Sequence, residues 1–252
     1  MRAILRLTLV EMKLFVREPL ALVFVFAFPL FVLFVLGGVF GNDVDLQDEE
    51  NLRVWRGVGP ADYYQPAYIG LVMASVGLIT MPLRITSYRE QGVLRRFEAA
   101  GVAKTAILGS QLLVGLGMMT VGAAAIVVAS NLSQGTSLSE SWGLTVPAYL
   151  LSAITFAVLG LMLGSVLPGS RAAQGAGMLL FFVMMFISGA GPPREVLANG
   201  MKGFSELLPL THVILLLQDT WLAAEWDGTA SLMVAAFLVV AGAVTLRFFR
   251  WE

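Results

Sequence analysis

The stretch YYQPAYIGLVMASVGLITMPL, residues 63–83, carries no charged side chain over 21 consecutive positions. The hydrocarbon core of a bilayer is about 30 Å thick, and a helix needs about 20 apolar residues to cross it. Six uncharged runs have this length, namely residues 20–40, 63–83, 105–131, 141–167, 172–190 and 228–246. Strands of a β-barrel would instead alternate in polarity over about ten residues. We therefore predict an all-α membrane protein with six transmembrane helices.

The composition agrees with this class. Hydrophobic residues make up 58% of the 252 residues and charged residues 13%, whereas soluble chains carry about 25% charged residues. The mean hydropathy is +0.81. There is no cysteine, which excludes disulfides and thiolate metal sites, and a single histidine excludes paired-histidine metal chemistry. We expect one transmembrane domain over residues 1–252, without a metal site.

Lysine and arginine are distributed unevenly between the loops. They collect before the first span, between the second and third spans, at Arg171 and at the C-terminus, while most acidic residues lie in the alternate loops. The positive-inside rule therefore places both termini and the 84–104 loop in the cytoplasm. The first apolar run is long and lacks a small-residue cleavage site, so we interpret it as a retained span and not as a signal peptide.

Residues 2–18 have helical character, with basic residues on one face. Arg2, Arg6, Lys13 and Arg17 fall within a sector of about 60° at 100° per residue. Such a helix is expected to lie in the inner membrane interface. Its basic stripe either anchors the chain to lipid headgroups or contacts a cytosolic partner.

A short segment of mixed charge, residues 88–100, lies between the second and third spans. Val93, Leu94, Phe97 and Ala100 form an apolar face by their spacing. The remaining charged positions have both signs, and they include Arg89, Glu90, Arg95, Arg96 and Glu98. We predict a helix that docks into a cleft of a soluble protein, the alternative being a solvated loop at the interface.

Residues 188–227 are irregular, because glycines and prolines interrupt them repeatedly. The apolar piece 207–217 is too short to cross a membrane. We expect a re-entrant helical hairpin on the outer side, because irregular backbone at membrane depth must be surrounded by protein or water. Gly160 and Gly164 form a G-x-x-x-G pattern that permits close helix contact, within the subunit or across a dimer.

No catalytic or nucleotide-binding motif is present. Glu98 and Ala103 stand where a Walker loop ending at Lys104 would need glycines. The six uncharged runs also lack the ionisable groups by which ion-coupled carriers usually transfer energy. We therefore expect a non-enzymatic chain whose energy source lies elsewhere.

Three stretches together resemble the type 2 ABC exporter permeases, the membrane subunits of ATP-driven exporters whose ATPase is a separate chain. VEMKLFVREPLALVFVFAFPLFVLFVLGG (10–38) is similar to the family's amphipathic helix, Arg-x-Pro turn and proline-containing first span. YREQGVLRRFEAAGVAKTAILGSQ (88–111) is similar to its segment from E-x-G to a small-residue turn. SGAGPPREVL (188–197), followed by ELLPLTHVILLLQD (206–219), resembles its Ser-Gly-Pro and Pro-Leu-Thr stretches. The resemblance covers nearly the whole chain.

The resemblance implies that two permease subunits, identical or homologous, pack around a central path, and that each binds a nucleotide-binding ATPase subunit. ATP and Mg²⁺ would bind in that partner, with no cofactor in this chain and no nucleic-acid partner. The implied coupling residues are Arg89, Glu90, Gly92, Leu94, Arg95, Arg96, Phe97 and Glu98. The implied second contact with the ATPase consists of Arg6, Lys13 and Arg17. The implied outer gate consists of Ser188, Gly189, Pro192, Pro193, Pro209 and His212. Motion of the coupling helix would then pass to the second and third spans.

The fifth span contains the run MLLFFVMMF, residues 178–186. Its flexible and aromatic side chains either line an apolar path or face lipid and neighbouring helices. The candidate path residues are Phe181, Phe182, Met184, Met185 and Phe186. By resemblance, we expect export of a hydrophobic or amphipathic small molecule across a bacterial plasma (inner) membrane, from the cytoplasm or the inner leaflet. The alternative is export of a lipid or a polysaccharide, followed by an ion-coupled secondary carrier.

Overall fold

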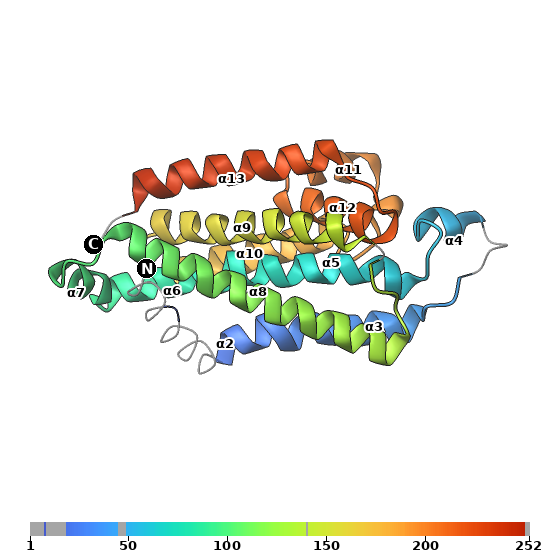
Figure 1. The fold of residues 1–252 in the computed structure, drawn as a ribbon, viewed down its shortest axis with the longest axis horizontal. Helices are drawn as coiled ribbons and strands as arrows, with labels where there is room; N and C mark the ends of the chain where they lie inside the picture. Colours follow the sequence, from blue (N-terminus) through green and yellow to red (C-terminus); the bar gives the residue numbers. More distant parts are fainter. Residues whose placement is uncertain (1–7, 9–18, 45–48, 140, 250–252) are drawn as a thin grey trace.

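Helices form all the regular structure in the parts of the chain that the computed structural model describes, which are residue 8 and residues 19–44, 49–139 and 141–249. Six of these helices are long and apolar enough to cross a membrane. They lie side by side along the longest axis of the molecule (Figure 1). This arrangement confirms the predicted all-α membrane class with six spans.

The observed spans lie close to the predicted ones. They are Val23–Phe40, Pro60–Glu90, Lys104–Gln134, Trp142–Val166, Ser170–Ile187 and Gly228–Phe248. The first contains the π-helix η1 (Val23–Ala27) and α3 (Phe28–Phe40), preceded by α2 (Pro19–Leu22). The second contains α5 (Pro60–Ala74), the π-helix η2 (Ser75–Thr80) and α6 (Met81–Glu90). The third to sixth spans are α8, α9, α10 and α13, in that order.

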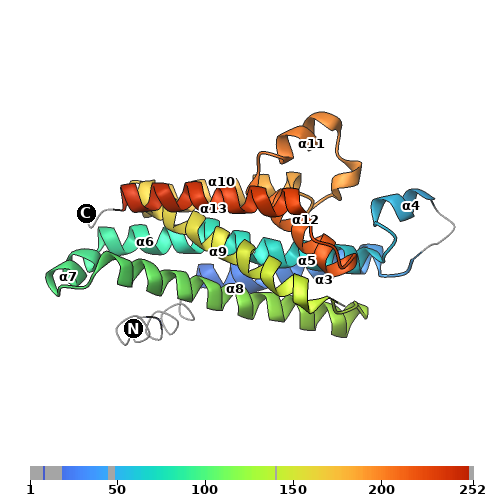
Figure 2. The ribbon, with the colours of Figure 1, turned by 45° about the horizontal axis from the view of Figure 1, so that its top comes forward.

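Short helices connect the spans at the two ends of the bundle. The α7 end carries α7 (Val93–Ala99) and the turn between α9 and α10, and the α4 end carries α4 (Glu49–Val54), η3 (Arg194–Val196), α11 (Asn199–Ser205) and α12 (Pro209–Leu222) (Figure 1). Helix α11 projects from the side of the bundle (Figure 2). Helices α11 and α12 are bent by 93° at the break between them, a geometry that fits either a broken span or a re-entrant hairpin.

Local sequence sets several helix ends. Pro60 stands in the first turn of α5, where its missing N–H costs nothing. The carboxylate of Asp227 caps α13 by accepting hydrogen bonds from the backbone N–H groups of Thr229 and Ala230, at 2.8 and 2.9 Å. Gly135 ends α8 in the left-handed conformation.

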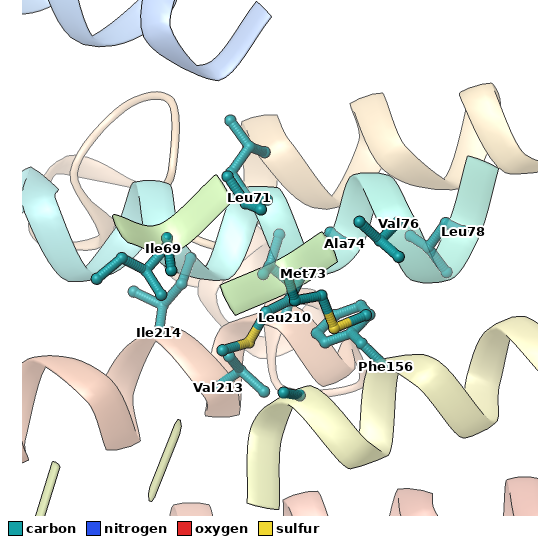
Figure 3. Packing of buried hydrophobic residues seen from close by; sticks show 14 of the residues in the cluster. Ile69, Leu71, Met73, Ala74, Val76, Leu78, Phe156, Leu210, Val213 and Ile214 are labelled. Atoms are coloured by element: carbon teal, nitrogen blue, oxygen red, sulfur yellow. The ribbon is translucent and has the colours of Figure 1, made fainter. Parts of the chain in front are cut away.

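The second span lies at the centre of the bundle. Its apolar window is 94% buried, compared with 17% for the first span and 22% for the sixth. It packs against α3, α8, α9, α10 and α12. Figure 3 shows its side chains Ile69 and Met73 among residues of α9 and α12. The second span is therefore the core of the subunit.

Close packing around this span depends on Gly160 and Gly164 of α9. A β-carbon on Gly160 would lie 2.6 Å from the carbonyl oxygen of Gly77, and one on Gly164 would lie 2.8 Å from the β-carbon of Ile85. Such distances leave no room for a side chain. The G-x-x-x-G contact, which the sequence left open between two possibilities, is thus made within the subunit.

The π-helix η2 has a local cause. Pro82 has no N–H, so it cannot bond to the carbonyl of Leu78 four residues earlier. The preceding N–H, of Met81, donates to the carbonyl of Val76, five residues back. The wider turn continues the helix through the proline, so the second span runs unbroken to Glu90. The span extends past the predicted boundary at residue 83. Arg84 therefore lies within the helix, and its side chain is buried.

Candidate functional site

The helix that the sequence predicts over residues 88–100 is divided in two. Helix α6 ends at Glu90, and α7 begins at Val93. Gly92 between them has φ +68°, a left-handed backbone conformation that residues other than glycine rarely adopt. Residues 88–90 therefore belong to the second span, and only the seven residues of α7 form the separate helix.

Helix α7 divides its side chains between the core and the surface. Leu94 is only 1% exposed, and Phe97 is half-buried against the hydrophobic core. Arg95, Arg96 and Glu98 are exposed. We call these three residues the α7 surface. Leu94 and Phe97 of the predicted apolar face thus pack inside the subunit, while the three charged groups are exposed.

Arg89 binds the C-terminal end of α9. Its Nη1 donates to the carbonyl of Gly164 at 3.3 Å, and its Nη2 donates to the carbonyl of Leu167. Carbonyl groups at a helix C-terminus have no helical partner, and the helix dipole favours a cation there. Arg89 therefore points into its own subunit.

Glu90 binds the beginning of the next helix. One carboxylate oxygen accepts a hydrogen bond from the backbone N–H of Ser170 at 2.9 Å, and the other accepts one from the Ser170 hydroxyl at 2.6 Å. Ser170 is the first residue of α10, where the helix dipole favours an anion. We call Arg89, Glu90 and the turn 164–170 the inner clamp.

The predicted path residues have different environments. Phe181 is fully buried, and its ring and that of Phe182 lie 5.8 and 5.9 Å from the ring of Phe28. Met184 and Met185 are buried as well. Phe186 is 55% exposed. Of these five residues, Phe186 is the one that the described structure presents openly at the surface.

An apolar groove of about 420 Å³ lies beside Phe186, between α3 and α10 and next to residues 191–193. Phe31, Val35 and Phe40 line it on one side, and Met185 and Phe186 on the other. Pro192 and Pro193 line it as well. Two of the predicted gate residues and two of the predicted path residues therefore share one site.

The other predicted gate residues lie inside the α4 end. Ser188 and Pro209 are buried, and Gly189 has φ +97°. The ring Nε2 of His212 lies 2.8 Å from the carbonyl oxygen of Glu206. His212 thus fixes the start of α12 to the preceding turn.

Several residues that the sequence analysis did not single out join the second span to the α4 end. The Tyr63 hydroxyl donates to Glu195 at 2.6 Å, and the Tyr64 hydroxyl donates to the carbonyl of Gly191 at 2.7 Å. Trp55 packs its ring against both tyrosines. Two adjacent tyrosines at the start of an apolar run are the signal that could have indicated a polar contact there.

Arg6, Lys13 and Arg17, predicted as a second contact with a partner, lie outside the described residues. Among the residues that are described, no cluster of three or more histidine, cysteine or acidic side chains could hold a metal ion.

Comparison with known proteins gave one family match. The family model described as ABC-2 type transporter matches residues 2–222. A search of curated proteins found no match.

Proposed function

This chain belongs to the ABC-2 type transporter family, and from that premise we propose that it is the membrane-spanning subunit of an exporter driven by ATP hydrolysis in a separate subunit. Membership makes it a multi-pass permease subunit. Export, the ATPase partner and the nature of the cargo are the parts that we propose.

The observation that carries the proposal is the α7 surface. Arg95, Arg96 and Glu98 are exposed on a helix at the tip of the bundle (Figure 1). A lipid-facing helix would bury apolar side chains in the bilayer, whereas here Leu94 turns towards the protein core. Exposed charges of both signs suit a complementary charged groove on a soluble protein. We propose that the ATPase binds there.

The orientation follows from the distribution of basic residues. The α7 end carries Arg89, Arg95 and Arg96, and Arg247 lies in the last turn of α13. By the positive-inside rule, we assign the α7 end to the cytoplasm and the α4 end to the outside of a bacterial plasma membrane. A second permease subunit, identical or homologous, would complete the transporter. ATP and Mg²⁺ would bind to the ATPase.

The apolar groove supports a hydrophobic or amphipathic cargo. Carbon atoms dominate its walls, which include Phe186 and Pro193. Within a membrane, a groove of this kind would hold the apolar part of a ligand mainly by close packing against it. We propose that Met185, Phe186 and the two prolines contact cargo on its way out.

The test is co-expression with a Walker-type ATPase encoded next to this chain, followed by purification and reconstitution into vesicles. The proposal expects the ATPase to co-purify and a fluorescent amphipathic dye to move only when ATP is present. Uphill transport without an ATPase, driven by an ion gradient, would reject it in favour of a secondary carrier.

A further inference from the structure

The inner clamp joins three helices at the α7 end. Arg89 and Glu90 are the last two residues of the second span. They bind opposite sides of one short turn, Arg89 at the end of α9 and Glu90 at the start of α10. Only Leu167, Pro168 and Gly169 separate the two helices.

The charges of the inner clamp match the polarity of the helix ends. A helix C-terminus carries partial negative charge and an N-terminus partial positive charge. The cation therefore meets the carbonyls of Gly164 and Leu167, and the anion meets the N–H of Ser170. Exchanging the two charges would put each beside its own sign.

The backbone of the turn is shaped to admit the carboxylate. A β-carbon on Gly169 would lie 2.5 Å from a carboxylate oxygen of Glu90. Its φ of −169° is extended backbone that any residue can adopt, so glycine matters here only for the space that it leaves to the Glu90 carboxylate. A larger residue at position 169 would push the Glu90 carboxylate away from Ser170.

We infer that the inner clamp is the element that transmits motion of α7 to the fourth and fifth spans. Only Gln91 and Gly92 separate Glu90 from α7. A force on α7 that moves the end of α6 therefore also moves the turn to which Arg89 and Glu90 are bonded. The family resemblance implies transmission from the coupling helix to the second and third spans. The inner clamp adds α10, which lines the apolar groove with Met185 and Phe186.

The inference gives Arg89 and Glu90 a role different from that of the α7 surface. The α7 surface would hold the ATPase, whereas Arg89 and Glu90 would be positioning residues inside the permease. The inference rests on the proposed function, because only an ATPase at α7 supplies the force. The two roles predict different defects: loss of binding for Glu98, and loss of coupling for Glu90.

The experiment compares Glu90→Ala, Gly169→Val and the exchanged pair Arg89→Glu with Glu90→Arg in the complete transporter. Since coupling between sites usually changes an equilibrium by about 5- to 150-fold, we expect transport per ATP hydrolysed to fall about tenfold in each variant. The ATPase should still co-purify and hydrolyse ATP. Glu90→Gln keeps an acceptor oxygen and should restore part of the coupling. Glu225→Ala, an exposed acid at the α4 end, should change nothing.

A second measurement follows the geometry itself. The chain has no cysteine, so spin labels can be placed on cysteines introduced at the exposed residues Ala99 and Ala172. The distance between them should be narrowly distributed and equal with and without trapped nucleotide. In Glu90→Ala the distribution of label distances should broaden. Because this measurement needs no ATPase, it separates failure of the clamp from failure of the proposed function.

The contrary outcomes are distinct. A wild-type chain that binds no ATPase would reject the proposed function, while the label distances in wild type and Glu90→Ala would still test the clamp. Normal transport per ATP in Glu90→Ala, loss of ATPase binding in that variant, or a wild-type label distance that changes with nucleotide would each overturn the inference.

Discussion

Gly160 on α9 and Gly77 on the second span approach so closely that a β-carbon at position 160 would lie 2.6 Å from the Gly77 carbonyl oxygen. The atom that it would meet is backbone and cannot rotate away. The helices would therefore have to separate.

Gly160→Ala should accordingly destabilise the protein. Overpacking of this kind costs about 1–3 kcal/mol, and we expect a lower midpoint in thermal unfolding of the purified protein. Gly143→Ala is the matched control on the same helix, because no atom lies within 4 Å of a β-carbon there. Equal midpoints for the two variants would contradict the observed packing.

Tyr63→Phe should weaken the attachment of the second span to residues 194–196. It removes a hydrogen bond to the carboxylate of Glu195, and such bonds to charged groups contribute about 1.5–3 kcal/mol. Tyr68→Phe serves as control, since the buried Tyr68 hydroxyl has no hydrogen-bond partner among the described residues. Unfolding experiments should show a loss of stability for Tyr63→Phe alone. Parallel losses for both would indicate that ring packing, and not the hydrogen bond, is affected.

Charge reversal on the α7 surface should weaken ATPase binding. Arg96→Glu and Glu98→Arg alter exposed side chains and leave the buried Leu94 in place, so the permease should fold normally. Charged groups at the edge of an interface mainly change association rates and salt dependence. Binding kinetics at low and high salt should show slower association for both variants, with Glu225→Arg as control. Association rates equal to that of the wild type would show that α7 does not form part of the interface with the ATPase.

Phe186→Ala should change cargo selection. Phe186 lines the apolar groove and is 55% exposed, and losing such a contact commonly alters discrimination between ligands by about tenfold or more. Leu179→Ala is the control, because Leu179 is exposed on the same helix but does not line the groove. Dose-response curves for several dyes should shift for Phe186→Ala only. Equal curves for wild type and both variants would exclude this groove from the path.

The orientation can be tested with single cysteines in this cysteine-free chain. Leu207→Cys and Ala99→Cys introduce thiols at exposed positions of the α4 end and the α7 end. We expect a membrane-impermeant maleimide to label Leu207→Cys in intact cells, and Ala99→Cys only after permeabilisation. The reverse pattern would invert the proposed topology.

Hydropathy was enough to predict the six spans but not which of them is central. The first span has mean hydropathy 2.7 and is 17% buried, whereas the second has 1.7 and is 94% buried. Lipid and protein core are equally apolar, so hydrophobicity does not distinguish them. The glycine pattern indicated close contact but not its partner, because Gly77, which meets Gly160, lies 83 residues away in sequence.

For the charged residues before α7, too, the contact partners could not be predicted from the sequence. The sequence placed Arg89 and Glu90 on a docking helix, since both are charged and adjacent to it. Arg89 binds the backbone carbonyls of residues 164 and 167, and Glu90 binds the backbone N–H and the hydroxyl of Ser170. Nothing in the sequence pairs these groups with residues 89 and 90. Backbone partners become known only once the turn between α9 and α10 is located in space.

The central position of the second span also bears on membrane thickness. Its 31 residues would extend about 46 Å at 1.5 Å per residue, well beyond a hydrocarbon layer of about 30 Å, yet neighbouring helices shield it from the lipid. A difference between helix length and bilayer thickness therefore affects the outer helices, which contact the lipid. The 18 residues of α10 extend only about 27 Å. A thicker membrane should therefore become thinner around this helix. The resulting strain should affect α10, and with it the wall of the groove, before the second span.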